Sequence, residues 1–92
     1  MATQTGAKAS TKASDFFEAA QIMAINLYGR WQDEHDYEKI EDYALPLTPI
    51  ANDHGVKIIK MTKRPFGCHF SVDGKTFQLK VTARAYEYKR IA

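Results

Sequence analysis

Basic side chains that recur through the C-terminal part of the sequence are its best candidates for chemistry. Cationic groups spaced along neighbouring strands suit a phosphate backbone, because they meet successive phosphates and release the counterions condensed there. The pattern predicts contact with a polyanion without reading of base sequence. The candidate nucleic-acid-binding residues are Lys57, Lys60, Lys63, Arg64, Lys75, Lys80, Arg84, Lys89 and Arg90, and strand alternation leaves open whether Lys57 or Lys60 faces the partner.

The two signs of charge are segregated along the chain, although the net charge of the 92 residues is only +2. Residues 1–54 hold 4 Lys or Arg and 9 Asp or Glu, a balance of −5, whereas residues 55–92 hold 9 and 2, a balance of +7. A basic half favours a nucleic-acid partner, and ordinary solvated lysines explain the charge equally well.

An acidic strip precedes the basic half and is the candidate protein-binding surface, since a protein with one negative and one positive face suits a nucleoprotein target. Its residues are Asp33, Glu34, Asp36 and Glu38. The alternative is that the two halves neutralise each other within the fold. His35 lies inside the strip, but residues so close in sequence do not all converge on one ion, so we expect a solvated face and no metal.

Catalytic chemistry finds little support in the sequence. Cys68 and His69 are neighbours on a predicted strand, where alternation points their side chains to opposite faces, so we expect a buried structural cysteine rather than a catalytic pair. A glycine-rich phosphate loop, a nucleophile elbow and an HExxH motif are all absent from the sequence. We therefore expect no enzyme activity and no cofactor. Tyr86, Tyr88 and His69 are candidates for stacking on bases, although aromatic residues at strand ends more often serve packing.

The chain is long enough for one small domain with a modest core. We expect a leader over residues 1–13 that is flexible, followed by a single α+β domain over residues 14–92. The sequence contains no run of 18 apolar residues, so we expect neither a membrane-spanning helix nor a signal peptide. A lone cysteine favours a reducing cytoplasm.

The N-terminal half predicts helices that cover one face of the sheet. A helix is expected over residues 15–28, with Ser14 as its N-cap and Gly29 at its end. The sequence also favours a second, short acidic helix between residues 33 and 42, because apolar side chains recur in and just after this stretch at a spacing of three. They are Tyr37, Ile40 and Tyr43. Residues 44–55 hold two prolines and a turn sequence, which indicates a connection.

The C-terminal half predicts an antiparallel sheet of three to four strands. Apolar residues alternate over 66–72 and 77–83, on either side of Asp73-Gly74, which favours a type I′ hairpin. This turn pairs Phe66 with Val81, Cys68 with Leu79, Phe70 with Phe77 and Val72 with Lys75. On the polar face it sets His69 opposite Gln78 and Gly67 opposite Lys80, with Lys63 near Arg84. Residues 56–62 form a further strand, and residues 86–91 extend or follow the last one.

The chain as a whole resembles phage anti-CRISPR proteins that act on the type I-F (Csy) surveillance complex. The likeness covers residues 1–92 and lies in the length, the opening MATQTGAKASTKASDFFEAAQ and the basic tail VKIIKMTKRPFGCHFSVDGKTFQLKV. It implies a non-enzymatic inhibitor in the cytoplasm of the bacterial host that contacts Cas proteins and the crRNA backbone and blocks pairing of target DNA with the guide. These inhibitors share no motif, so the resemblance assigns no residue.

The sequence leaves three possible functions, which differ in what the protein would bind. An inhibitor of a nucleoprotein complex would bind the assembled ribonucleoprotein more tightly than naked RNA. A stand-alone nucleic-acid-binding protein would bind free RNA or DNA with strong salt dependence. A small enzyme would need a substrate pocket that the sequence does not locate.

Overall fold

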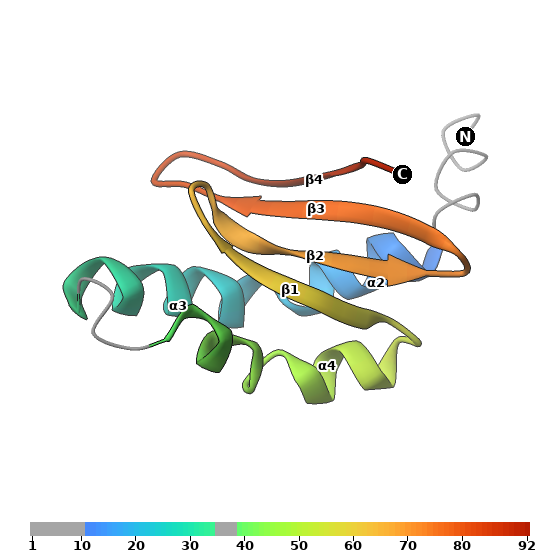
Figure 1. The fold of residues 1–92 in the computed structure, drawn as a ribbon, viewed down its shortest axis with the longest axis horizontal. Coiled ribbons are helices and arrows are strands. Elements are labelled where there is room, and N and C mark those ends of the chain that lie inside the picture. Colours follow the sequence, from blue (N-terminus) through green and yellow to red (C-terminus); the bar gives the residue numbers. More distant parts are fainter. Residues whose placement is uncertain (1–10, 35–38) are drawn as a thin grey trace.

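A layer of helices packs on one face of a four-stranded antiparallel sheet in the computed structural model, which describes residues 11–34 and 39–92 (Figure 1). The helices are α2 (Thr11–Ala19), α3 (Gln21–Glu34), the 3-10 helix η1 (Ile40–Ala44) and α4 (Thr48–Asp53). The strands are β1 (Lys57–Lys63), β2 (Phe66–Val72), β3 (Lys75–Val81) and β4 (Tyr86–Arg90). The predicted α+β class is confirmed. Most of the predicted leader, residues 1–10, lies outside the described ranges.

The single helix predicted over residues 15–28 is in fact two helices, α2 and α3, which together extend beyond the predicted range at both ends. Thr11 begins α2, so Ser14 lies inside the helix rather than at its cap. Ala13 is only 1% exposed and belongs to the core, so residues 11–13 are part of the folded domain. Ala13 opens a buried stripe that continues at helical spacing along both helices. Its further members are Phe16, Ala20, Ala24 and Leu27.

Gly29 does not end the helix, because α3 runs on to Glu34. A glycine inside a helix costs about 1 kcal/mol relative to alanine, which the packing of Leu27 and Trp31 on either side outweighs. The junction of α2 and α3 also keeps its helical hydrogen bonds. Ala20 N–H donates to Phe16 O at 2.9 Å, and Ala24 N–H donates to Ala20 O at 2.8 Å.

The segment after α3 is only partly as predicted. Ile40 and Tyr43 are both buried on one side of η1, which confirms their shared face, whereas Tyr37 lies outside the described residues. The predicted connection over residues 44–55 contains the helix α4, so that prediction was wrong for its middle. Pro49 is compatible with α4 because it occupies the first turn, where the missing N–H has no helical partner to lose.

The sheet is a meander in the order β1-β2-β3-β4, and the predicted hairpin register is confirmed for all four pairs on the apolar face, including Val72 with Lys75. Asp73 and Gly74 have φ values of +54° and +78°, the two positive angles that a type I′ turn requires. The apolar side of the hairpin faces the helices: the Phe16 and Phe70 rings meet edge to face with centroids 4.9 Å apart. Residues 86–90 form the fourth strand.

Cys68 sits in the middle of this core with no exposed surface, as predicted. Burial raises the pKa of its thiol from the ordinary 9.0 to about 12, because a thiolate there would lose its hydration. His69, its neighbour in sequence, points to the opposite face of the sheet. The two side chains therefore do not form a catalytic pair.

Candidate nucleic-acid interface

The face of the sheet that carries no helices is the candidate interface, and we call it the open face (Figure 1). Directly opposed residues of neighbouring strands share a face, so the buried pair Cys68 and Leu79 fixes which side chains point away from the helices. The open-face residues are Lys57, Lys60, Thr62, Gly67, His69, Ser71, Thr76, Gln78, Lys80, Glu87 and Lys89.

A β-bulge in β1 brings two lysines to this face where simple alternation allows only one. The register shifts between Ile58 and Lys60, so Ile59 is an extra residue without a partner on β2. Ile58 pairs with Phe70 on the helix side, whereas Lys57 pairs with Ser71 and Lys60 with His69 on the open side. Both of the alternatives that the sequence left open are therefore realised.

One row of paired residues crosses all four strands on the open face. It consists of Lys60, His69, Gln78 and Lys89, one from each strand in order. Neighbouring strands lie about 4.8 Å apart, so the row spans about 14 Å with a lysine at each edge of the sheet. Two polar side chains, His69 and Gln78, lie between these cations. This arrangement offers phosphate partners at both ends and hydrogen-bonding groups in the middle.

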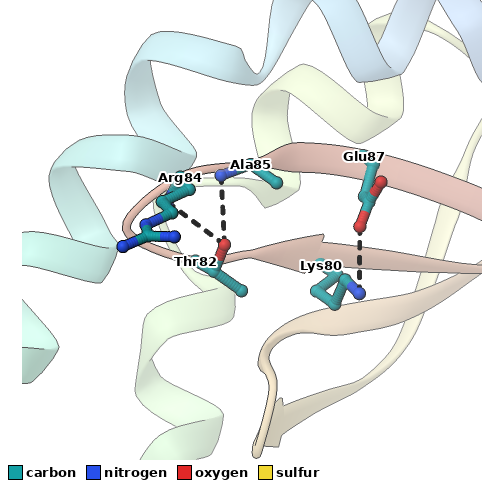
Figure 2. A network of polar contacts seen from close by, with 5 residues as sticks. All are labelled: Lys80, Thr82, Arg84, Ala85 and Glu87. Carbon is teal, nitrogen blue, oxygen red and sulfur yellow. Dashed lines mark hydrogen bonds and ion pairs between the residues drawn. The ribbon is translucent and has the colours of Figure 1, made fainter.

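Lys80 is the one open-face lysine that is paired within the described residues. Its Nζ lies 2.9 Å from Oε2 of Glu87, which stands directly opposite on β4 (Figure 2). Lys57, Lys60 and Lys89 are exposed, and no carboxylate of the described chain lies within ion-pair distance of them. These three ammonium groups are therefore available to an external anion.

Five of the nine predicted basic residues lie off the open face. Lys63, Lys75 and Arg90 are paired with Phe66, Val72 and Phe77, so their positions belong to the helix-side rows at the two ends of the sheet. The expectation that Lys63 lies on the polar face was wrong, because the chain turns after Lys63 and this residue pairs with Phe66, whose face it shares. Arg64 and Arg84 lie in turns at the end of the sheet that carries Lys63.

The turn that holds Arg84 is fixed by a threonine. Thr82 Oγ1 accepts the backbone N–H of Ala85 at 3.0 Å and that of Arg84 at 3.3 Å (Figure 2). Thr82 N–H in turn donates to Ala85 O at 2.8 Å, which closes the connection between β3 and β4. The Arg84 side chain is exposed beside this turn, so it extends the positive charge beyond the open face.

Negative charge gathers on the helix layer, on the other side of the molecule. Its exposed members are Asp15, Glu18, Asp33, Glu41, Asp42 and Asp53. Of the predicted protein-binding strip, Asp33 is exposed near the end of α3, while Asp36, Glu38 and the side chain of Glu34 lie outside what the structure describes. Within the described ranges, no ion pair joins an acidic side chain of the helix layer to a basic side chain of the sheet.

The tyrosines of β4 serve packing rather than an exposed stacking surface. Tyr86 stacks on Phe17 with ring centroids 4.2 Å apart, and Tyr88 lies against the same ring at 4.6 Å. The Tyr86 hydroxyl donates a hydrogen bond to Phe17 O. Burial, and secondly a negative charge at Cys68, raise the pKa of Tyr86 well above its usual range. Of the three predicted stacking candidates, His69 is the one on the open face.

The open face also carries a hollow of about 440 Å³ that the sequence did not predict. Its lining residues are Pro65, Gln78, Lys80, Glu87, Tyr88 and Lys89. They come from two strands and the turn between β1 and β2, so only the folded register brings them together. One feature of the sequence could have pointed to this hollow, namely the alternation of tyrosine with Glu87 and Lys89 in β4. If the two tyrosines pack against the helices, Glu87 and Lys89 must lie on the open face.

The described residues contain no group of three or more histidine, cysteine or acidic side chains placed to hold a metal ion. Likewise, no helix within the described ranges has the length and apolar character needed to cross a bilayer. Comparisons with protein-family models, with curated proteins and with solved structures find no match for this chain.

Proposed function

We propose that this chain is a non-catalytic binding protein whose open face contacts the phosphate backbone of a ribonucleoprotein. Following the resemblance of its sequence, the proposed target is the type I-F crRNA-guided surveillance complex, which it would inhibit in the cytoplasm of the bacterial host. The observation that carries the proposal is the set of unpaired lysines on one face, Lys57, Lys60 and Lys89, opposite an exposed acidic helix layer.

The two charged layers suit different parts of such a target. Lysines on the sheet would meet guide phosphates and speed association, since attraction between opposite charges raises encounter rates. The acidic helix layer would meet basic surfaces of Cas subunits, where complementary charge sets orientation. Target recognition begins with pairing at a seed and proceeds through a nearly balanced exchange of duplexes. A protein that occupies the guide therefore needs tight binding but no catalysis.

Binding to the assembled type I-F complex tests the proposal, with free crRNA and free duplex DNA as parallel ligands. We expect tight binding to the complex, weak binding to the free nucleic acids, and loss of target-DNA capture by the loaded complex. Binding to free nucleic acid alone would instead support a stand-alone nucleic-acid-binding protein. Binding to none of the three ligands contradicts both functions.

A matched pair of charge reversals tests the role of the open face. Lys60→Glu and Lys39→Glu make the same change in net charge at exposed lysines, but Lys60 lies on the open face and Lys39 precedes η1 in the helix layer. We expect Lys60→Glu to weaken binding to the guide complex by about tenfold or more, since it replaces attraction by repulsion at a phosphate. Lys39→Glu should have little effect. Equal effects would show that net charge alone matters.

The alternative function, a stand-alone nucleic-acid-binding protein, makes a quantitative prediction that distinguishes it from an inhibitor of the guide complex. Contact of three unpaired lysines with single-stranded nucleic acid predicts a slope of about −2 in a plot of log affinity against log salt. An inhibitor that also forms an interface with Cas subunits should bind the complex far more tightly than contacts between lysines and phosphates alone allow. Measurement of the salt slope on free RNA and on the complex compares the two directly.

A further inference from the structure

The hollow on the open face differs from its surroundings because it contains a carboxylate. Among the described residues, Glu87 is the one acidic side chain on that face, and it lines the hollow together with Lys80, Lys89 and Gln78. A site for phosphate would gain nothing from a negative charge at this position. The carboxylate instead offers a hydrogen-bond acceptor, which suits a ligand group that donates hydrogen bonds.

Glu87 is held in place with part of its carboxylate free. Its Oε2 is bound by Lys80 Nζ at 2.9 Å, and the two side chains point towards each other across β3 and β4 (Figure 2). The side chain of Glu87 is still 55% exposed, so its other oxygen, Oε1, is free to accept a hydrogen bond from a ligand. Gln78 lines the same hollow and adds an amide that both donates and accepts.

The hollow has room for a flat ring. Its volume of about 440 Å³ falls within the range of about 300–1,000 Å³ typical of small-molecule sites. Gly67 stands directly opposite Lys80, so β2 places no side chain at that position. Pro65 adds an apolar surface to the lining. The hollow thus combines a fixed acceptor, an amide and an apolar contact.

We propose that this hollow binds an unpaired nucleobase through its exocyclic amino group, with Glu87 as the acceptor and Gln78 beside it. Carboxylates are known partners of the cytosine amino group. Lys89 lies at the rim and Lys60 at the far end of the same row, where they would contact the flanking phosphates. The inference rests on the proposed function of the open face. A guide base held in this way cannot pair with target DNA.

Cytosine and uracil provide the sharpest comparison, because cytosine carries an amino group where uracil carries a carbonyl oxygen. Fluorescence anisotropy at low salt and neutral pH would measure binding of oligocytidylate and oligouridylate of equal length. We expect the protein to prefer the cytidine oligomer by about fivefold, the low end of what one base contact supplies.

Glu87→Gln tests the acceptor, because glutamine keeps the size but loses the charge and offers donors as well as an acceptor. We expect this variant to lose the preference for cytidine while its affinity for uridine is unchanged or higher. Glu41→Gln, which removes the same charge from the exposed surface of η1, should keep the preference. Circular dichroism would verify that all three proteins are folded alike.

Two results would overturn the inference alone. One is equal binding of cytidine and uridine oligomers by the unaltered protein. The other is a Glu87→Gln variant that binds both oligomers more tightly and keeps the preference, since the hollow would then hold phosphate. Failure to bind either oligomer also overturns it. In that case the measurement on the guide complex decides separately whether the proposed function fails.

Discussion

Raising the pH should destabilise this fold through the buried thiol of Cys68. Burial raises the pKa of the thiol from 9.0 to about 12, so the folded protein holds this proton over a range in which the unfolded chain has released it. A raised pKa in the folded state gives stability that is complete below pH 9 and is lost as the pH rises towards 12. Each unit of that interval removes about 1.4 kcal/mol.

The thiol should therefore account for a loss of about 1.4 kcal/mol at pH 10 and about 2.7 kcal/mol at pH 11. The unaltered protein alone does not isolate this contribution, because its stability at high pH depends on every group that loses a proton there. Cys68→Ala removes the thiol, together with its smaller effect on the pKa of Tyr86, and leaves the other ionisable groups in place. Its packing cost is measured at pH 8, where the thiol is neutral in both states, and is subtracted from the values at higher pH.

Urea unfolding followed by circular dichroism at pH 8, 9, 10 and 11, with a reductant present, gives the free energy of unfolding for both proteins. We expect the unaltered protein to lose stability faster than Cys68→Ala, so that the difference between the two narrows by about 2–3 kcal/mol over this series. Parallel loss in the two proteins would refute the reasoning, because it would mean that the thiol titrates alike in the folded and unfolded states.

The sheet supports three further expectations. Gly67→Ala should lower the free energy of unfolding by about 3 kcal/mol in a urea titration, since its Cβ would lie 1.9 Å from Leu79 O and the strands would have to separate. Gly29→Ala, whose Cβ would point into open space on α3, should instead raise it by about 0.5–1 kcal/mol. Deletion of Ile59 should remove the bulge and keep Lys60 on the open face, so the protein should still bind the guide complex. A folded deletion variant that no longer binds would contradict this assignment of the bulge.

The sequence was sufficient to predict the hairpin because two independent signals agreed there. The turn chemistry of Asp73-Gly74 set the register, and that register placed every alternating apolar residue of β2 and β3 on one face. The helix boundaries were harder to predict, because packing in the core extends the helices beyond the residues that would cap them. Ser14 and Gly29 are good cap residues, but Ala13 and Trp31 lie beyond them and have contacts in the core.

The candidate interface was predictable in composition but not in geometry. The residues from Lys57 to Lys63 fit a strand in either alternation, and only pairing with β2 shows that Ile59 is extra. This single extra residue lets Lys57 and Lys60 share a face, whereas Lys63 is on the other face because it pairs with Phe66. The hollow depends on Pro65 and Glu87, which β2 and β3 separate in sequence. They lie at the same end of the sheet because Pro65 is in the turn before β2 and Gly67, Lys80 and Glu87 form one row across three strands.

The separation of charge between the two layers follows from the order of elements along the chain. In the part of the chain that the structure describes, the helices all come from the acidic half and the strands all come from the basic half, so each layer takes the charge of its half. A meander needs only short turns between strands, which keeps the basic residues on the sheet side. The open-face carboxylate of Glu87 is bound by Lys80, so a phosphate backbone approaching along Lys57, Lys60 and Lys89 meets cations. The same residue also gives this face a means to distinguish one base from another, which lysines alone do not provide.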